Sequence, residues 1–415
     1  MITALLLLAA VAPANVDATV RSITKSSAYR GAAASIDANH DRWVEDIVAI
    51  TQIPSPPFKE QARAKAFADM LKARGLEATI DAEGNVLALR RGTQPGPVVV
   101  VSAHLDTVFP EGTDVTVKRE GTRLSAPGVG DDSSGLATML ALVDAMNAGK
   151  LRTRSDILFV GTVGEEGLGD LRGVRYLFNQ GEYKGRIRAF FSLDGGGLDS
   201  MTTGGTGSKR YRVTFKGPGG HSYGAFGIVN PLASLAATVT ELYKLDVPKD
   251  PKTTFSASVI GGGTSVNAIP ESVWLEVDMR SESAAELDKL ERQFLDIVPR
   301  TVAAENAARS TRAGSVTAEF KPIGARPAGS TPADAEIVRI AEAAHRAEGI
   351  KVSRETSSTD ANEPMRLGIP AITMSRIVKS SGAHSPAEWV DTEKAPNVKL
   401  KRVLLTTILA TAGVP

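Results

Sequence analysis

Continuous β-branched runs punctuate the first half of the chain, and Pro97-Val-Val-Val-Val-Ser-Ala103 is the clearest of them. Such a run predicts a strand that is buried on both faces of a sheet. Between these runs the apolar residues take helical spacing, as Phe67, Met70 and Leu71 do in a segment that Gly75 ends. The alternation predicts an α/β fold with a mixed, mostly parallel sheet flanked by helices. The predicted strands are 97–103, 156–163 and 187–193, and the predicted helices are 57–74, 134–148 and 171–180.

A different order of elements follows the glycine-rich stretch 204–207, where we expect a flexible domain boundary. The pattern there reads strand, helix, strand, strand, helix, strand, which is the order of a ferredoxin-like unit. We therefore predict an inserted α+β domain at 208–323, between two parts of a first domain at 19–207 and 324–415. The inserted elements are strands 210–216, 254–260, 272–281 and 315–322 and helices 230–245 and 286–305. The second part of the first domain should add helix 334–348, strand 371–374 and helix 394–412.

The first residues have the pattern of a secretory leader. Ala4–Ala12 is a run of nine apolar residues, which is shorter than the roughly 20 that a membrane-spanning helix needs. Small residues at 12–14 and 16–18 offer two cleavage sites. We therefore interpret 1–18 as a signal peptide and expect a periplasmic or secreted protein, or a cytoplasmic one if the run is not a signal. No later stretch reaches spanning length without charges, so we expect no stable membrane insertion.

Composition narrows the chemistry that is open to the chain. Its 415 residues include 48 Lys and Arg, 47 Asp and Glu, and no cysteine, which gives a formal net charge of +1. Such a balance offers no broad basic surface to a polyanion, so nucleic acid is not an expected partner. Without cysteine there are no disulfides, thiolate metal sites or cysteine nucleophiles. A bound metal must therefore be held by Asp, Glu and the five histidines.

Polar residues follow the ends of the predicted buried strands, where open α/β sheets build their sites. His104 and Asp106 come directly after strand 97–103 and should face the same way, so that Asp106 can hold the imidazole of His104. Taken singly, each such residue is more simply explained as a turn, a helix cap or a surface group. Five groups at successive strand ends instead favour one joint site. The other four groups are Asp131-Asp132, Glu165-Glu166, Asp194 and His384.

Two imidazoles and three or four carboxylates are hard nitrogen and oxygen donors. They suit a pair of zinc ions that share a bridging carboxylate. Three carboxylates would leave a residual positive charge between two Zn²⁺ ions, and this charge would stabilise a bound hydroxide. In Glu165-Glu166 one residue can ligate a metal while its neighbour serves as general base.

This ordered set, interrupted by a ferredoxin-like insertion, resembles the dinuclear zinc metallopeptidase family. That family contains peptidase T, glutamate carboxypeptidase, aminoacylase and succinyl-diaminopimelate desuccinylase, and the resemblance runs from about Val44 to the C-terminus. It implies the zinc exopeptidase type of fold and two Zn²⁺ ions per subunit, for which Co²⁺ or Mn²⁺ could substitute. It assigns His104, Asp131 and Asp194 to one metal. Asp131, Glu166 and His384 are assigned to the other.

The resemblance also implies roles for residues around the metals. Asp131 would bridge the two ions and be followed by a cis peptide bond, Glu165 would be the general base, and Asp106 would support His104. In the inserted domain, His221 matches the family's histidine that polarises the scissile carbonyl, usually in the active site of a partner subunit. A homodimer through the inserted domain is therefore expected. Asn267 and Arg280 match residues that hold the carboxylate or carbonyl of the substrate, although Arg280 could also be a simple surface charge.

Two departures from the family pattern bear on function. Ser133 stands where the family usually has Lys, which removes no ligand. Asp194 stands where the deacylase and carboxypeptidase branches usually have Glu, and so resembles the aminopeptidase and dipeptidase branch that includes peptidase T.

We therefore expect a zinc-dependent exopeptidase, an aminopeptidase or a dipeptidase, that cleaves small peptides with metal-activated hydroxide and a Glu general base. The alternative is an N-acyl-amino-acid amidohydrolase or carboxypeptidase of the same family. A remote alternative is a protein that binds peptides or metal without turnover.

Overall fold

The largest element of the computed structural model, which describes residues 15–94 and 96–415, is a sheet of nine strands. Its central strands β6, β3, β7 and β17 are mutually parallel, whereas β1 and β2 join one side in antiparallel fashion. Across the sheet the strands are β1 (Ala78–Ile80), β2 (Val86–Arg90), β6 (Ile157–Thr162), β3 (Val98–His104), β7 (Ile187–Gly196), β17 (Ala371–Ile377), β8 (Ser200–Gly205) and β15 (Gly329–Ser330), and β16 (Ser353–Ser357) pairs with β8.

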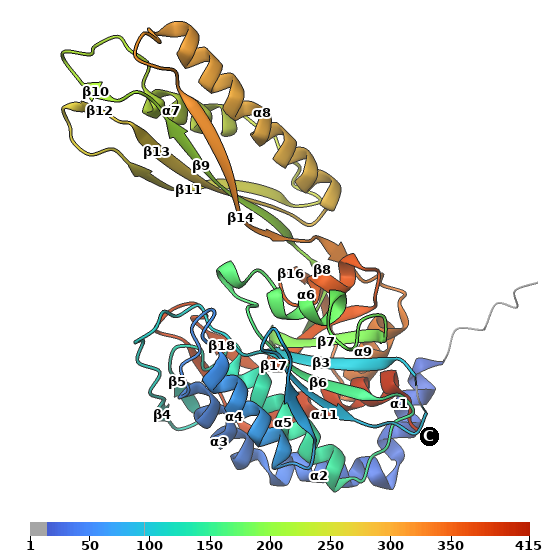
Figure 1. Cartoon of the computed structure of the whole chain (residues 1–415). Helices are drawn as coiled ribbons and strands as arrows, with labels where there is room; N and C mark the ends of the chain where they lie inside the picture. Colours follow the sequence, from blue (N-terminus) through green and yellow to red (C-terminus); the bar gives the residue numbers. More distant parts are fainter. Residues whose placement is uncertain (1–14, 95) are drawn as a thin grey trace, which may run out of the picture.

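Helices cover both faces of this large sheet (Figure 1), which explains why its central strands are mostly apolar. In β3 all seven residues are buried. Val99 and Val101 belong to the larger core, whereas Val98 and Val100 belong to the core on the other face. The larger core includes α2 (Ser27–Ala38), α3 (His40–Thr51), α4 (Gln61–Lys72), α5 (Ser133–Ala148), α9 (Glu336–Ala347) and α11 (Lys394–Ala412), and the other core includes α6 (Arg172–Asn179) and α10 (Asn362–Arg366).

The fold class predicted from the sequence is confirmed, although no bounds were predicted for the helices before residue 52. Helix α1 (Val16–Lys25) buries Val16, Val20 and Ile23, a spacing of four and three residues that is itself a helical signal. The helix begins at Val16, within the predicted signal peptide 1–18, of which residues 1–14 lie outside the described residues. Among the helices of the described chain, none has the length and apolar character that crossing a bilayer requires.

The boundary expected at 204–207 coincides with the change from β8 of the large sheet to β9 (Gly207–Lys216) of a second sheet. The expected flexibility is wrong, because these glycines are strand residues in close contact with neighbours. A Cβ atom at Gly204 would lie 2.7 Å from Thr356 Oγ1, and one at Gly207 would lie 2.6 Å from the backbone nitrogen of Ala328. The glycines therefore permit close packing, which composition alone does not distinguish from flexibility.

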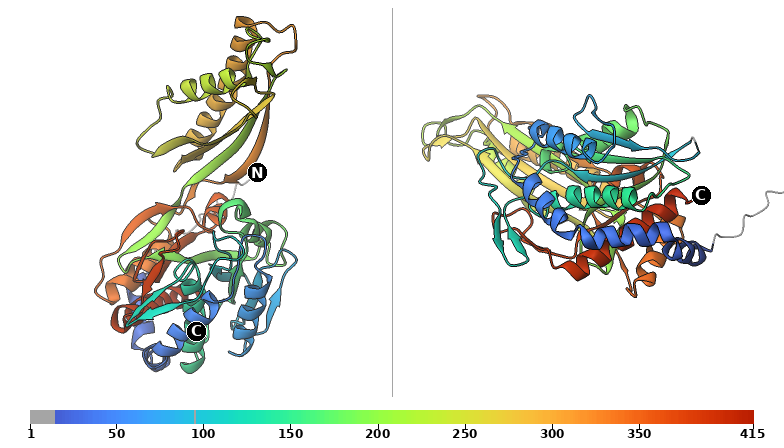
Figure 2. Two further views of the ribbon diagram at one scale, coloured as in Figure 1. Left: turned by 90° about the vertical axis from the view of Figure 1, so that its left-hand side faces the viewer. Right: turned by 90° about the horizontal axis from the view of Figure 1, so that it is seen from below.

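A second part, called the lid here, is a four-stranded antiparallel sheet in the order β11-β13-β9-β14, with two helices on one face. This strand order and helix placement are those of a ferredoxin-like unit. Figure 2 shows the lid standing away from the large sheet, to which its strands lead directly. Its elements are β9 (Gly207–Lys216), α7 (Pro231–Leu242), β11 (Thr253–Gly262), β13 (Ser272–Ser281), α8 (Ala284–Ala308) and β14 (Thr317–Arg326), together with the short pair β10 (Gly220–His221) and β12 (Ala268–Ile269).

A third, small sheet lies beside the end of the large one. It consists of β18 (Lys379–Ser381), β19 (Trp389–Asp391), β5 (Arg123–Ser125) and β4 (Lys118–Glu120). Its β18–β19 loop contains His384, and the chain from β5 leads to the Asp131 loop. The small sheet thus brings two segments that are distant in sequence to the same end of the large sheet.

A buried lysine, Lys401, lies within the larger core. Lys401 of α11 is 1% exposed, and its Nζ lies 3.4 Å from the centroid of the Trp43 ring. Within the described residues, its amine has no hydrogen-bond partner. Burial therefore lowers the pKa of Lys401 well below its usual value.

We expect Lys401→Met to raise the free energy of unfolding at pH 7 by about 1–3 kcal/mol, because it replaces an unpartnered buried amine with an apolar chain of similar length. Because folding lowers the pKa of Lys401, the buried amine costs stability at pH values below its unfolded pKa of about 10.4. The stability advantage of the variant should therefore shrink as the pH rises towards that value. Urea unfolding of both proteins at neutral and alkaline pH checks this. A variant less stable at pH 7 would show that the contact with Trp43 outweighs desolvation.

Candidate metal centre and active site

The parallel strands of the large sheet bring the predicted metal ligands to one edge. His104 ends β3, Asp194 lies near the end of β7, and Glu166 follows β6. Asp131 comes from the loop before α5, and His384 comes from the β18–β19 loop. Because the carboxyl ends of parallel strands meet at one edge, this is where an open α/β sheet places a site.

The five side chains meet around Asp131, each of whose oxygens faces a different histidine. His104 Nε2 lies 2.9 Å from Asp131 Oδ1 and 3.9 Å from Asp194 Oδ1. His384 Nε2 lies 3.3 Å from Asp131 Oδ2 and 2.8 Å from Glu166 Oε1. Donor atoms that share one tetrahedral zinc ion lie roughly 3.3 Å apart, given metal–ligand distances of about 2.0–2.1 Å. The residues present therefore fit metal binding, with each oxygen of Asp131 facing one histidine.

Hydrogen bonds to the neighbouring acids raise the pKa of both histidines of this cluster. Hydrogen bonds to Asp131 and Glu166 raise the pKa of His384 to about 10. Burial alone would lower the pKa of His104, but its hydrogen bonds with Asp106 and Asp131 outweigh burial and raise it. Metal ions require neutral imidazoles, so metal binding at this cluster would release protons.

Asp106 supports more of the cluster than the sequence predicted. The backbone oxygen of Asp106 lies 3.0 Å from His104 Nδ1, whereas its carboxylate oxygen Oδ1 lies 3.6 Å from the same nitrogen. The carboxylate instead accepts hydrogen bonds from the backbone nitrogens of Glu165, at 3.0 Å, and Glu166, at 2.8 Å. Asp106 thus fixes the turn that presents the acid pair, in addition to its contact with His104.

The loop that carries Asp131 is held by Glu388, which the sequence analysis did not identify. Its carboxylate accepts hydrogen bonds from the backbone nitrogens of Gly128, Gly130 and Asp131 at 2.7, 2.9 and 2.8 Å. A Cβ atom at Gly130 would lie 2.8 Å from Glu388 Oε1, so only glycine leaves room for this contact. The next peptide bond, between Asp131 and Asp132, is cis, as the resemblance implied.

Glu165 points into the cavity beside the cluster and is paired with a buried arginine. Arg326 Nη1 lies 2.9 Å from Glu165 Oε1 and 3.1 Å from Ser358 Oγ, and Arg326 also donates to the backbone oxygen of Glu165. Burial raises the pKa of Glu165 well above its usual value, against the opposing effect of Arg326. A carboxylate with a raised pKa accepts protons more readily near neutral pH, as a general base must.

Arg376 is a second buried arginine that the sequence analysis missed, although a single cation within the buried strand β17 was a visible signal. It contacts the carboxylate and backbone oxygen of Asp194. Its guanidinium also lies 3.5 Å from Asp131 Oδ1 and 3.6 Å from Asp132 Oδ1. Burial raises the pKa of Asp194 to about 7 despite this neighbour. Arg376 therefore supplies fixed positive charge beside the candidate ligands.

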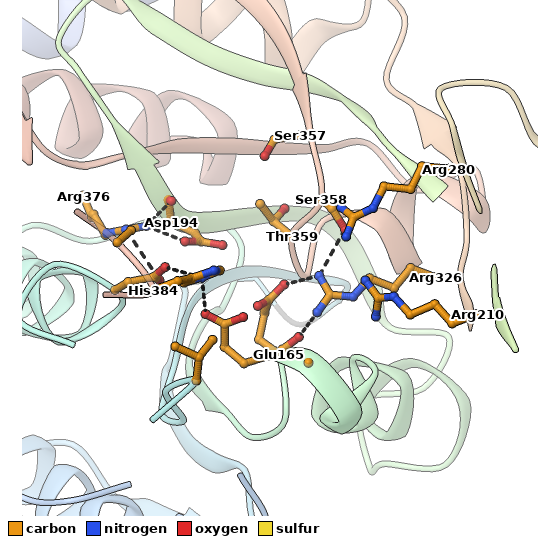
Figure 3. Close-up of a pocket in the computed structure, with 15 residues that line it drawn as sticks. Glu165, Asp194, Arg210, Arg280, Arg326, Ser357, Ser358, Thr359, Arg376 and His384 are labelled. Atoms are coloured by element: carbon orange, nitrogen blue, oxygen red, sulfur yellow. Dashed lines mark hydrogen bonds and ion pairs between the residues drawn. The ribbon is translucent and has the colours of Figure 1, made fainter. Parts of the chain in front are cut away.

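The candidate metal ligands line a cavity of about 520 Å³ between the large sheet and the lid. In Figure 3, Arg376, Asp194 and His384 lie on one side of Glu165, and Arg210, Arg280 and Arg326 lie on the other. The structure thus brings Arg280 of the lid to the same cavity as the candidate metal ligands.

His221 and Asn267 are not brought to this cavity. They line a separate hollow of about 720 Å³ beside β10 and β12, at the end of the lid far from the large sheet (Figure 1). There the backbone nitrogen of Ser222 donates to the backbone oxygen of Asn267 at 2.9 Å. With the lid in this position, His221 and Asn267 therefore cannot fill their predicted roles in the cavity of Glu165.

Comparison with known proteins agrees with this geometry. Residues 100–408 match the family described as Peptidase family M20/M25/M40. Among curated proteins, the chain is 31% identical over 137 residues to a protein of Pyrococcus abyssi named as a LysW-lysine/LysW-ornithine hydrolase. That alignment covers 33% of this chain and 36% of the relative, so it spans about a third of either protein.

Solved structures resemble nearly the whole chain. The aminopeptidase PepT from Bacillus cereus has a TM-score of 0.73 at 20% identity, over 90% of this chain and 99% of that one. The dipeptidase Dug1p from Saccharomyces cerevisiae also has a TM-score of 0.73, at 14% identity, over 93% of this chain and 99% of that one. At these identities the likeness establishes a shared fold.

We expect Arg376→Met to lower the free energy of unfolding of the metal-free protein by about 3–5 kcal/mol, because it leaves the carboxylates of Asp131, Asp132 and Asp194 without their fixed cation. Zinc should reduce this loss, since bound ions supply positive charge at the same place. Thermal unfolding of both proteins in EDTA and in excess zinc measures the difference. An equal loss under both conditions would show that zinc does not bind near Arg376.

Proposed function

Because the chain belongs to peptidase family M20/M25/M40, we propose that it is an aminopeptidase or dipeptidase that hydrolyses small peptides with two zinc ions. The observation that carries the proposal is the position of Asp131, whose two oxygens face two different histidines. A carboxylate placed in this way suits two metal ions rather than one.

The chain offers a complete ligand set for two ions. His104 and Asp194 would hold one ion, Glu166 and His384 would hold the other, and Asp131 would bind both. When bound, the two ions would lower the pKa of a water molecule and polarise the scissile carbonyl. His384 has a φ of +65°, which is uncommon for a residue other than glycine and is typical of functional positions.

Glu165 is the residue placed to move the proton. It would accept a proton from the attacking water and transfer it to the departing amine, which must gain a proton to leave. Its burial and raised pKa favour the first of these transfers. Asp106 fixes its backbone, and Arg326 fixes its carboxylate.

The charges of the cavity favour a short peptide with a free carboxylate. Arg210, Arg280 and Arg326 lie on one side of Glu165, and Asp194, His384 and Arg376 lie on the other (Figure 3). The three arginines on one side suit the carboxylate that a dipeptide carries at its end. Asp194, on the other side, is the residue that resembles the aminopeptidase branch.

An N-acyl-amino-acid amidohydrolase or a carboxypeptidase is the second candidate. The same ligands and Glu165 would serve it, and the partial match to proteins named LysW-lysine/LysW-ornithine hydrolases fits a hydrolase of either kind. A silent peptide-binding protein is disfavoured, because all five ligand positions and Glu165 are present.

Hydrolysis of Ala-Ala and N-acetyl-Ala-Ala, before and after metal stripping and zinc readdition, separates these functions. We expect zinc-restored cleavage of Ala-Ala, with at least tenfold lower kcat/KM on the acetylated peptide. Glu165→Ala should lower kcat by about 10²–10⁴-fold while the protein retains its metal, because proton transfer is lost. Preference for the acetylated peptide would establish the second candidate, and bound metal without turnover on a wider panel would establish a binding protein.

We also propose that a second copy of the chain supplies His221. The proposal is supported by the position of His221 at the far end of the lid, in a hollow separate from the cavity of Glu165. A homodimer through the lid would let this imidazole enter the partner's active site and stabilise the oxyanion there.

Mixing two inactive variants tests the shared site. Glu165→Ala and His221→Ala should each be nearly inactive, and random mixed dimers should regain about a quarter of the wild-type activity, because half of the dimers contain one intact site of two. The measurement is peptide hydrolysis after coexpression of the two chains. No regain, with dimers confirmed by sedimentation, would place His221 in the active site of its own chain or outside catalysis.

A further inference from the structure

One buried carboxylate joins the loop that carries His384 to the loop that carries Asp131. Glu388 is 1% exposed and lies in the same β18–β19 loop as His384. Its backbone oxygen accepts from the backbone nitrogen of Ala126 at 3.1 Å. Its carboxylate accepts from three backbone nitrogens of the Asp131 loop, which include that of Asp131 itself at 2.8 Å. Glu388 therefore holds the Asp131 loop against the loop of His384.

The β18–β19 loop is closed by its own backbone. The nitrogen of Ser385 donates to the backbone oxygen of Gly382 at 3.0 Å, and the nitrogen of Glu388 donates to the backbone oxygen of Ser385 at 3.1 Å. A Cβ atom at Gly382 would lie 2.9 Å from the backbone oxygen of Ala387, so the turn has room only for glycine. His384 and Glu388 are therefore fixed relative to one another within this turn.

The candidate ligands differ in how their backbone is supported. His104 and Asp194 are residues of β3 and β7, two strands that pair within the large sheet. His384 lies in a loop, and its side chain is 56% exposed. Its Nε2 faces Asp131 Oδ2 at 3.3 Å and Glu166 Oε1 at 2.8 Å. The spacing between His384 and Asp131 therefore depends on how their two loops are held together, which is the contact that Glu388 makes.

The Asp131 loop is shaped around this carboxylate. Hydrogen bonds from backbone N–H groups to an ionised carboxylate are roughly twice as strong as those to a neutral acceptor. A Cβ atom at Gly130 would lie 2.8 Å from Glu388 Oε1 and 3.1 Å from Val390 Cγ1. A methyl group at Gly130 would therefore push Glu388 from its place without removing it.

We propose that Glu388 is a positioning residue that matches the two metal positions to one another, because it holds the shared ligand Asp131 within reach of His384. Glu388 acts through Asp131 and contacts neither metal nor substrate. Replacing a group that orients a metal ligand typically lowers metal affinity by about 10–100-fold. The ion held by Asp131, Glu166 and His384 depends most on Glu388. The inference rests on the proposed two-ion site and names a residue that determines the affinity of one ion relative to the other.

The chain contains a matched control for Glu388. Asp81 holds the turn between β1 and β2, where its Oδ1 accepts from the backbone nitrogens of Glu83, Gly84 and Asn85, each at 2.9 Å. Its Oδ2 accepts from Asn85 Nδ2 at 2.8 Å. Asp81→Asn and Glu388→Gln thus both place a new amide group where a carboxylate accepted several N–H donors. None of the five candidate ligands belongs to the Asp81 turn.

The test measures zinc affinities of the metal-stripped protein by chelator competition and counts bound ions by native mass spectrometry. The wild type should bind two ions. In Glu388→Gln the affinity for the more weakly bound ion should fall by about 10–100-fold, and that for the other by less than about threefold. Asp81→Asn should keep the wild-type ratio of the two affinities. In His384→Ala, which retains the ligands of one ion, adding Glu388→Gln should change the affinity of that ion by less than about threefold.

Thermal unfolding identifies a variant that fails to fold. If Glu388→Gln is one, Gly130→Ala displaces the same carboxylate and should produce the same selective loss of one ion. Two bound ions with equal losses of affinity, or with no loss, would overturn the positioning role while the two-ion site stands. Lower thermal stability with an unchanged ratio of affinities would likewise show that Glu388 only supports the fold. Fewer than two zinc ions on the wild type would contradict the proposed function itself, and the inference with it.

Discussion

The structure depends on compensating the negative charge gathered at one edge of the large sheet. Asp132, Glu165 and Glu166 are buried there, and Asp131 and Asp194 are nearly so. Carboxylates removed from water are costly unless cations or hydrogen-bond donors face them. Arg326 and Arg376 lie against these carboxylates, and His104 and His384 lie beside Asp131 and Glu166. The same need for positive charge suits this edge to metal ions. The backbone around Asp131 and Glu165 is correspondingly fixed by the carboxylates of Glu388 and Asp106.

The candidate ligands could be found from the sequence because each follows a recognisable element. An apolar run marks a buried strand, and His104 or Asp194 stands at its end, so the parallel order of the strands brings them together. Arg326 and Glu388 carry no such local mark. Their importance arises from which strands and loops become neighbours, and that depends on the topology of the whole sheet. Arg376 was the exception, since an arginine inside a strand as apolar as 371–377 already requires a buried partner.

The inserted domain shows a different limit of sequence analysis. Its order of strands and helices predicted the ferredoxin-like unit, because local hydrophobic patterns determine secondary structure well. The same patterns do not say how the lid stands against the large sheet. His221, Asn267 and Arg280 could therefore be identified by their motifs, but only the three-dimensional arrangement separates Arg280, which lines the catalytic cavity, from the other two. The glycines at 204–207 were misread for a related reason, since close contacts between distant segments leave no trace in composition.

The position of Arg326 has a mechanical consequence. It is the last residue of β14, where the lid sheet ends, and its guanidinium holds Glu165, which lies in the turn after strand β6 of the large sheet. A rotation of the lid about this junction therefore stretches or relaxes the ion pair. By thermodynamic reciprocity, a ligand that draws Arg326 away from Glu165 also shifts the preferred angle of the lid. The lid angle and the freedom of the Glu165 carboxylate are thus linked through Arg326.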